Sequence, residues 1–353
     1  MKKILGVLFV SLLIILTYGC NQLPKLYVLN WGDYMDSDLI SAFEDEYNVN
    51  VVYKEVGSNE EMATLLQAGT SVYDIVIPSD YMIDKLIQED LIQPIDFTKL
   101  TNLSNLEVID TLYSLYSESG IEDYVVPYAW GTIGIMYNTD VIGLDTLLEN
   151  EGWAAFFEHG DIYRSAMYDS PRDAIAASLL YKGFNVNSED GSELSAAETA
   201  LKEANFYAWG EDNLKSLVIE GVVDMALVYS GDYFSEYYIA DEEERTINFD
   251  YFVPSSTNVW LDAMVIPTIS ENTDLAYQFI NFFLQEHIAL QNSDYIGYAP
   301  CYQVIYNQMV DDLGYDFDTF NPYPVGSNRQ MYVYGSNARS EALVSILARA
   351  KAA

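Results

Sequence analysis

Apolar residues along the chain gather in short continuous runs and in stripes with a helical period. The short runs have the length and the β-branched and aromatic content of buried strands. They cover residues 49–56, 73–78, 165–168, 225–229 and 259–267. The stripes repeat apolar residues every three or four positions, as amphipathic helices do. They cover residues 37–47, 59–69, 81–89, 172–181, 195–205, 275–285 and 335–352.

The order of these stretches predicts the fold class. Strands and helices alternate from the N-terminal part onward, which is typical of an α/β protein with parallel strands and helices on both faces. A longer apolar run, 124–137, is interrupted at Trp130-Gly131-Thr132. Residues 241–245 are expected to form a solvated turn and residues 317–325 a loop rich in proline and aromatics.

One run carries candidate chemistry at its end. Leu26–Tyr34 begins as a strand and ends with Trp31, Asp33 and Tyr34 around Gly32, where the chain can turn. In open α/β sheets, ligands bind at the carboxyl ends of the strands. Aromatic side chains beside a carboxylate suit an organic cation. The alternative is a half-exposed aromatic turn in which Asp33 caps the next helix.

The N-terminal residues predict a targeting segment. Lys2 and Lys3 precede an apolar stretch, Ile4–Leu16, which has signal-peptide length and is too short for an ordinary membrane span. Gly19-Cys20 follows and resembles a bacterial lipobox, although Thr17 and Tyr18 depart from its usual residues. We expect a signal peptide over 1–19, a lipidated Cys20 and a tether over 20–25; an uncleaved anchor is the alternative. Both place the domain outside the membrane.

Composition narrows the class of ligand. The 353 residues are enough for about two domains. With 54 acidic against 16 basic residues, the formal net charge is −38. Nucleic acid needs a basic footprint and is therefore excluded as a partner. A cationic ligand fits a negative field, although an acidic surface that keeps the protein soluble explains most of these charges equally well.

The sequence lacks the usual signatures of catalysis. His159 and His287 are the only histidines, and neither has metal-ligand spacing. No phosphate loop, dinucleotide fingerprint or nucleophile elbow is present. Cys301 is the only cysteine besides Cys20, and a lipidated Cys20 cannot pair with it, so no disulfide is expected. We therefore expect a protein that is not an enzyme and needs no cofactor or metal.

Six segments resemble, in order, the spermidine/putrescine-binding periplasmic proteins, which are the receptors of polyamine ABC importers. These segments are Asn30-Trp31-Gly32-Asp33-Tyr34, Gly57-Ser58-Asn59-Glu60-Glu61-Met62, the run 73–81 that ends in Pro78-Ser79-Asp80-Tyr81, Pro127-Tyr128-Ala129-Trp130-Gly131, Trp260-Leu261-Asp262 with Val265-Ile266-Pro267, and Ile296-Gly297-Tyr298-Ala299-Pro300.

The resemblance implies an architecture and partners. The fold would be the two-lobed periplasmic-binding-protein fold, an α/β fold with a ligand cleft between the lobes. Lobe 1 would comprise 26–129 plus 266–304, and lobe 2 would comprise 130–265 plus 305–353, so the chain would cross three times. The protein would be an extracytoplasmic monomer on a lipid anchor, working with permease subunits and a cytoplasmic ATPase.

The resemblance also implies a polyamine site. A polyamine needs aromatic walls for its methylenes and carboxylates for its ammonium groups. Asp262 and Trp260 share one strand face, and Asp262 is the expected principal carboxylate; a helix cap is its alternative role. The expected ligand-binding residues are Trp31, Asp33, Tyr34, Ser79, Tyr81, Ser170, Asp173, Tyr229, Trp260, Asp262 and Tyr298.

Three departures from the family pattern leave ligand choice open. Ser170 stands where the family has an aspartate, Asp173 replaces a glutamate, and Tyr229 replaces a tryptophan. The family's C-terminal binding glutamine has no secure counterpart, with Met331 or Tyr332 nearby. The preference between putrescine and spermidine is therefore undecided. A receptor for another small solute and a transporter-independent ligand sensor remain as alternatives, because fold does not fix function.

Overall fold

The structure is a computed structural model that describes residues 23–69, 72–315 and 328–352. The strands in these ranges are β1 (Lys25–Trp31), β2 (Asn50–Val56), β3 (Ile75–Val76), β4 (Ile92–Gln93), β5 (Val126–Asn138), β6 (Ser165–Tyr168), β7 (Ala208–Gly210), β8 (Met225–Tyr229), β9 (Phe249–Phe252), β10 (Ser256–Met264), β11 (Ile266–Pro267), β12 (Ala299–Pro300) and β13 (Asn328–Met331).

The helices connect and cover these strands. They are α2 (Ser37–Tyr47), α3 (Asn59–Ala68), α4 (Asp80–Gln88), η1 (Phe97–Lys99), η2 (Thr101–Asn105), α5 (Asp110–Glu118), η3 (Glu122–Tyr124), α6 (Leu144–Glu151), α7 (Trp153–Phe157), α8 (Pro171–Tyr181), α9 (Gly191–Glu203), α10 (Leu214–Ile219), α11 (Ser230–Glu242), α12 (Thr273–Phe283), α13 (Glu286–Ile296), α14 (Gln303–Asp311) and α16 (Asn337–Lys351), the η elements being 3-10 helices.

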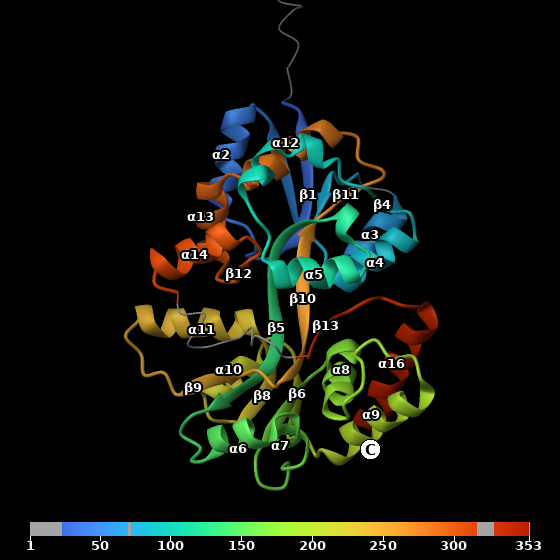
Figure 1. Cartoon of the computed structure of the whole chain (residues 1–353), viewed down its shortest axis with the longest axis vertical. Coiled ribbons are helices and arrows are strands. Elements are labelled where there is room, and N and C mark those ends of the chain that lie inside the picture. The colour runs from blue at the N-terminus through green and yellow to red at the C-terminus, as the bar shows by residue number, and fades with distance from the viewer. Residues whose placement is uncertain (1–22, 70–71, 316–327, 353) are drawn as a thin grey trace, which may run out of the picture.

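The elements form two lobes, one above the other in Figure 1. The upper lobe holds β1 to α5 together with α12, α13 and α14, and the lower lobe holds α6 to β9 together with α16. The chain thus returns to the upper lobe after building the lower one. This is the expected α/β fold class with two lobes. The residues at which one lobe ends and the other begins stay a prediction.

Two long strands, β5 and β10, run between the lobes at the centre of the molecule (Figure 1). They pair antiparallel from Val259↔Thr132 to Met264↔Val126, with a bulge between Asp262 and Ala263. At its upper end β5 also pairs with β12, and at its lower end with β8 and β9. Side chains at the centre of these strands therefore lie where the lobes meet.

Separate sheets organise the two lobes. In the upper lobe β1 lies between β2 and β3 in a parallel three-stranded sheet. In the lower lobe β8, β6 and β7 extend the larger mixed sheet, with β6 parallel to both neighbours. The parallel pairs confirm the alternating strand and helix pattern of the sequence.

The expected interruption at Gly131 is wrong, because β5 is continuous and all thirteen of its residues are buried. A Cβ on Gly131 would lie 2.4 Å from the Ser230 hydroxyl and 2.5 Å from the Trp260 ring. The glycine is therefore needed for close packing of neighbouring elements rather than for a turn. The expected acidic turn is also shifted, because α11 continues to Glu242, and residues 317–325 lie outside the described ranges.

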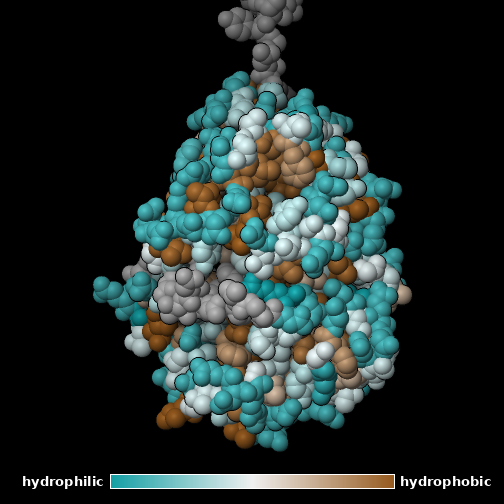
Figure 2. Space-filling view, viewed as in Figure 1, coloured by the Kyte–Doolittle hydropathy of each residue, from teal (hydrophilic) through white to brown (hydrophobic). Residues whose placement is uncertain are grey.

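Buried side chains fill both lobes, one cluster in the upper lobe and around α11, another around α6 to α9 and α16. On the face shown in Figure 2, hydrophilic residues dominate and apolar ones form separate groups. Within the ranges that the structure describes, no helix is long and apolar enough to cross a membrane.

Candidate ligand-binding site

The expected principal carboxylate, Asp262, lies buried on β10 at the junction of the lobes, with 7% of its surface exposed. Its neighbour across an isolated β-bridge is Ser79, at the start of α4. The Tyr34 hydroxyl donates to Asp262 Oδ2 at 3.0 Å. Asp262 Oδ1 is buried and accepts no hydrogen bond from the described residues. Half of this carboxylate is therefore available to a donor from outside the protein.

The surroundings of Asp262 change its acidity. Burial raises the pKa of the Asp262 carboxyl to about 6, while the hydroxyls of Ser79 and Tyr34 and the charge of Arg172 oppose that rise. No basic side chain in the described ranges lies within ion-pair distance of this carboxyl. An isolated carboxylate in a dry environment is unfavourable, so an added cation would be stabilised here.

A chain of four aromatic rings leads away from Asp262. Tyr34 contacts Tyr298 edge to face at a centroid distance of 5.4 Å, and Tyr298 contacts Trp260 at 5.6 Å. Trp260 contacts Tyr229 at 6.1 Å. These rings come from four segments that are distant in sequence, and they form the apolar surface expected for a methylene chain.

Local contacts position two of these rings, those of Tyr298 and Tyr34. Tyr298 follows Gly297, which ends α13 in the left-handed conformation with φ 69°. The Tyr298 ring then packs directly on Gly231, where a Cβ would lie 1.8 Å from it. The main-chain carbonyl of Tyr34 accepts from Tyr128 at 2.5 Å and from Asn30 at 3.3 Å.

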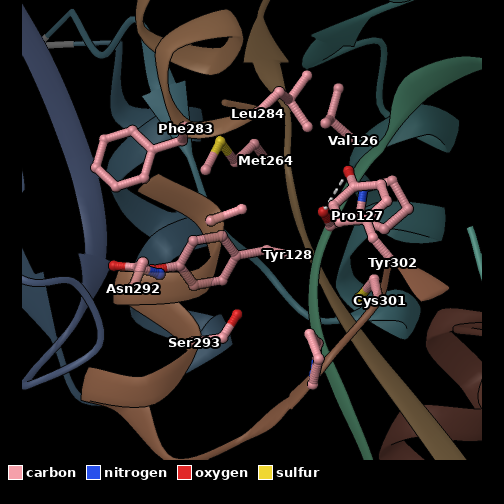
Figure 3. A pocket seen from close by; sticks show the side chains of 12 residues that line it. Val126, Pro127, Tyr128, Met264, Phe283, Leu284, Asn292, Ser293, Cys301 and Tyr302 are labelled. Atoms are coloured by element: carbon pink, nitrogen blue, oxygen red, sulfur yellow. Dashed lines mark hydrogen bonds between the residues drawn. The ribbon is translucent and has the colours of Figure 1, made fainter. Parts of the chain in front are cut away.

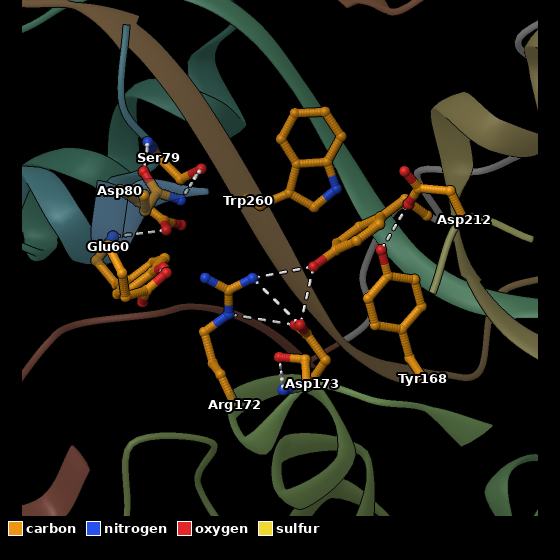
Figure 4. A network of polar contacts seen from close by, with 12 residues as sticks. Glu60, Ser79, Asp80, Tyr168, Arg172, Asp173, Asp212 and Trp260 are labelled. Carbon is orange, nitrogen blue, oxygen red and sulfur yellow. Dashed lines mark hydrogen bonds and ion pairs between the residues drawn. The ribbon is translucent and has the colours of Figure 1, made fainter. Parts of the chain in front are cut away.

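The far end of the ring chain reaches a second carboxylate, Asp173 in the first turn of α8 (Figure 4). The Tyr229 hydroxyl donates to Asp173 Oδ2 at 2.9 Å. Arg172 contacts both Asp173 oxygens at 3.2 Å and donates to the Tyr229 hydroxyl at 2.9 Å. Ser170 caps α8, its hydroxyl accepting from the Asp173 N–H at 3.3 Å. The Asp173 carboxylate therefore already has a cationic partner, Arg172.

Arg172 connects the lobes. Its guanidinium lies 4.2 Å from the centroid of Tyr81 on α4 and 5.2 Å from that of Tyr332, which follows β13. Tyr81 in turn donates to Glu60 at 3.0 Å. Tyr332 lies in the region where the family glutamine has no secure counterpart, and its hydroxyl is buried without a partner among the described residues. In the sequence analysis Glu60 is only a motif residue and Arg172 only the start of an expected helix, and neither has a role there.

Asp80 is the main feature that the sequence analysis missed. It is 1% exposed, and Oδ1 accepts from the Tyr81 N–H at 2.7 Å. Asp80 Oδ2 has no hydrogen-bond partner among the described residues. Burial raises the pKa of the Asp80 carboxyl to about 8. Arg172 and the main-chain N–H groups of Tyr81 and Leu261 oppose the rise in this pKa, and the charge of Asp262 adds to it. The only signal was its place inside the motif Ser79-Asp80-Tyr81.

Other polar contacts at the lower edge of the site are self-contained. Lys215 pairs with the buried Asp232 at 2.8 Å, and Tyr168 donates to Asp212 at 2.7 Å (Figure 4). The Tyr168 ring contacts the Tyr229 ring at 5.3 Å. These contacts support the chain of aromatic rings, and the buried charge among them, Asp232, is paired.

Two expected residues lie apart from this network. Trp31 is half-buried at the end of β1, and its indole N–H is buried without an acceptor among the described residues. Asp33 is exposed, with φ 50°. The structure thus brings Tyr34, Ser79, Tyr81, Ser170, Asp173, Tyr229, Trp260, Asp262 and Tyr298 into one network, but records no contact of Trp31 or Asp33 with it.

Two hollows elsewhere do not match the expected ligand. One lies within the upper lobe beside Tyr128, Cys301 and Tyr302 (Figure 3) and measures about 30 Å³, room for roughly one water molecule. The other is an open polar groove of about 540 Å³ between α5, residues 183–187 and β13. Neither is lined by an expected site residue. The described part of the chain contains no cluster of metal-ligating side chains.

Comparison with known proteins also indicates a solute-binding protein. A family model described as bacterial extracellular solute-binding protein matches residues 38–312. The spermidine/putrescine-binding periplasmic protein of Escherichia coli is 32% identical over 277 residues, which cover 77% of this chain and 76% of that one. The putrescine-binding periplasmic protein SpuD of Pseudomonas aeruginosa is 30% identical over 283 residues, 77% of each chain.

Solved structures show the same similarity in three dimensions. The spermidine/putrescine ABC transporter substrate-binding protein PotD of Streptococcus pneumoniae has a TM-score of 0.73 at 28% identity, covering 93% of this chain and 99% of that one. The Tp0655 (TpPotD) lipoprotein of Treponema pallidum has a TM-score of 0.75 at 25% identity, covering 92% and 99%.

Proposed function

Because the chain belongs to the bacterial extracellular solute-binding proteins, in the spermidine/putrescine-binding family, we propose that it binds polyamines for an ABC importer. This is a family of solute-binding proteins rather than enzymes. The proposed ligands are putrescine and spermidine, which the names of the relatives give for those proteins.

The observation that carries the proposal is the half-free carboxylate of Asp262. Its Oδ2 atom is held by Tyr34 at 3.0 Å, so the group has a defined orientation. Its Oδ1 atom is buried without a partner among the described residues, which is costly unless a ligand donates to it. An alkylammonium group supplies both the donor and the missing positive charge.

The proposed ligand follows the ring chain from Asp262 toward Asp173. Its methylene groups contact Tyr34, Tyr298 and Trp260, and an ammonium group over an aromatic ring gains about 0.5–2 kcal/mol. At the second end Asp173 is shared with Arg172, so an ammonium there competes with the guanidinium. Strong attraction is therefore expected at one end of the ligand and weaker attraction at the other.

This charge distribution favours a diamine. Ser170, which stands where the family carries an aspartate, caps α8 and adds no charge. The second end of the site therefore lacks a free carboxylate for the additional ammonium of a triamine. We infer that putrescine binds at least as well as spermidine.

Location and partners extend the proposal. The family is extracytoplasmic. We propose that Cys20, which lies outside the described residues, carries the lipid anchor, and that the protein is a monomer that delivers its ligand to permease subunits driven by a cytoplasmic ATPase. Contacts made only when the lobes close around the ligand would favour the closed form.

A second candidate ligand class is a solute that carries a carboxylate. The observation in its favour is Arg172, a cation with a side chain only 23% exposed at the site. Arg172 already contacts both oxygens of Asp173, so a carboxylate would have to displace that partner. The diamine needs no such displacement and is the first choice.

The test is a titration panel on the mature protein. Melting temperatures with putrescine, spermidine, 1,4-butanediol, amino acids and sugars would be followed by calorimetry on every compound that shifts them. We expect both polyamines to bind and the diol, which has the putrescine carbon chain without charge, to fail. Binding of an amino acid or a sugar without polyamine binding would overturn the proposal.

A further inference from the structure

Asp80 is a buried acid in the first turn of α4 that no part of the proposed binding mode uses. Its side chain is 1% exposed, yet only one of its oxygens has a partner, the N–H of Tyr81 at 2.7 Å. Asp80 Oδ2 is buried and unpartnered among the described residues. A carboxylate that served only to stabilise the start of α4 would not need this second oxygen in a dry interior.

The position of Asp80 brings it next to Asp262. The isolated bridge between Ser79 and Asp262, with the N–H of Ala263 donating to the Pro78 carbonyl at 3.2 Å, holds the start of α4 against β10. The charge of Asp262 raises the pKa of Asp80, in keeping with this position. Each of them has one buried oxygen without a partner.

The buried charges around the site do not balance. Arg172 is paired with Asp173 at 3.2 Å, and Lys215 is paired with Asp232 at 2.8 Å. Asp80 and Asp262 have no cation within 4.0 Å in the described ranges. If both are ionised, the enclosed site carries two uncompensated negative charges, which equals the charge of a diamine in magnitude.

An ion pair across the lobes is the competing explanation. Arg172 faces Asp80 from α8, and its charge lowers the Asp80 pKa. However, the guanidinium contacts Asp173 and Tyr229 and lies over Tyr81, and no Arg172–Asp80 pair within 4.0 Å is present. Arg172 is therefore occupied, and Asp80 retains an oxygen for another donor.

We propose that Asp80 is a second ligand-binding carboxylate, which shares one terminal ammonium group of the polyamine with Asp262. A primary ammonium has three N–H donors, so it can bond Asp262 Oδ1 and Asp80 Oδ2 at once. Asp80 then adds, from α4 in the upper lobe, a second acid at the Asp262 end of the site, whereas the Ser170 end gains none. This proposal rests on the proposed polyamine function.

The first test compares Asp80→Asn with Asp110→Asn. Asp110 is also the first residue of its helix, α5, but it is exposed, so it controls for the loss of a charge at that helix position. Calorimetry should show putrescine binding at least 30-fold weaker in Asp80→Asn, since losing one partner of a buried charge pair costs about 2–5 kcal/mol. Asp110→Asn should bind within about twofold of wild type.

A second measurement separates ligand contact from a structural role. Calorimetry in buffers of different ionisation enthalpy reports protons released on binding. Asp80 and Asp262 should lose protons when the ammonium arrives, whereas Arg172 and the tyrosines around them, Tyr34, Tyr81 and Tyr332, should not. We expect proton release by the wild type near pH 7 and less release by Asp80→Asn.

A further Asp80 variant controls for misfolding. Asp80→Ser keeps a side-chain oxygen for the Tyr81 N–H without the charge, and its ligand-free melting curve shows whether the fold survives. Unchanged affinity and unchanged proton release in both Asp80 variants would overturn the inference while leaving the polyamine function intact. A wild type that binds no polyamine would instead reject the function itself.

Discussion

The substitution Asp262→Asn separates binding from folding at one position. It keeps the shape of the side chain and removes its charge. The carboxyl is 7% exposed, and burial raises its pKa from 3.8 to about 6. Since each pKa unit corresponds to about 1.4 kcal/mol, the ionised group destabilises the ligand-free fold by about 3 kcal/mol.

The sign of this effect follows from linkage. The folded-state pKa lies above the unfolded value, so the penalty is absent below about pH 4, grows between pH 4 and 6, and is complete at pH 7. Asparagine has no such penalty. Its oxygen can still accept from Tyr34, but its NH₂ group is left without an acceptor, at a cost of about 1–3 kcal/mol.

The expected outcome is a ligand-free Asp262→Asn protein that is as stable as the wild type at pH 7, or more stable by up to about 2 kcal/mol. Ligand at about 100 times Kd stabilises the wild type by about 2.7 kcal/mol, and this gain should vanish in the variant. Melting curves with and without putrescine, followed by calorimetry, measure both quantities.

Tyr34→Phe provides a graded control, because it keeps the ring and removes only the hydroxyl that orients Asp262. A hydrogen bond to a charged group contributes about 1.5–3 kcal/mol, so this variant should bind about 10- to 150-fold more weakly. Affinity of Asp262→Asn within a few-fold of wild type would refute the assignment of the principal carboxylate. Destabilisation of that variant by more than about 2 kcal/mol would instead show that the Asp262 carboxylate stabilises the ligand-free fold.

Three further outcomes can be measured with the same assays. Ser170→Asp, in which aspartate remains a good helix cap, should shift preference toward spermidine in paired titrations at one ionic strength; a wild type that already prefers spermidine tenfold would contradict the reasoning. Gly231→Ala should displace the Tyr298 ring and weaken putrescine binding, whereas Gly191→Ala, whose Cβ would meet nothing within 4 Å, should not; equal affinities would exclude Tyr298 as a wall. Putrescine affinity should fall as the pH drops below about 6, because the ligand must then displace a proton from Asp262, and a flat profile between pH 5 and 7 would show that Asp262 does not bind the ammonium.

Local patterns in the sequence predicted the regular elements well. The expected helix over 37–47 and the strands over 165–168 and 225–229 are found with the same bounds. Apolar periodicity and capping residues act within a few positions, so these elements need no tertiary information. The strand expected over 73–78 is shorter in the structure, Ile75–Val76, although the N–H groups of Asp74 and Ile77 also donate to main-chain carbonyls of β1.

The site was predictable only through the resemblance. Tyr34 and Asp262 meet across 228 positions, which no local pattern reveals. The missed acid, Asp80, was quoted in its motif without a role, and its burial follows from contact of α4 with β10 rather than from its neighbours in sequence. Asp33 is the opposite case. The sequence places its carboxylate at a strand end, as expected for a site residue, but in the fold it is exposed.

In the proposed binding mode, the unbalanced carboxylates link the charge of the ligand to closure of the lobes. Asp80 reaches the site from α4 in the upper lobe, and Asp173 and Arg172 reach it from α8 in the lower lobe. At neutral pH, closing the site without a cation would bury the ionised Asp262 against its pKa of about 6, and separation of the lobes would return it to water.

In the proposed binding mode a diamine would reverse that balance, because its ammonium groups would compensate the carboxylates while its methylenes would cover the ring chain. 1,4-Butanediol offers the same carbon chain and two hydroxyl donors but leaves the buried charges uncompensated. Its contacts with Tyr34, Tyr298 and Trp260 should therefore be insufficient for closure. If the diol stabilised the protein as much as putrescine does, ring contacts rather than charge would control closure, and the roles given to Asp262 and Asp80 would both fail.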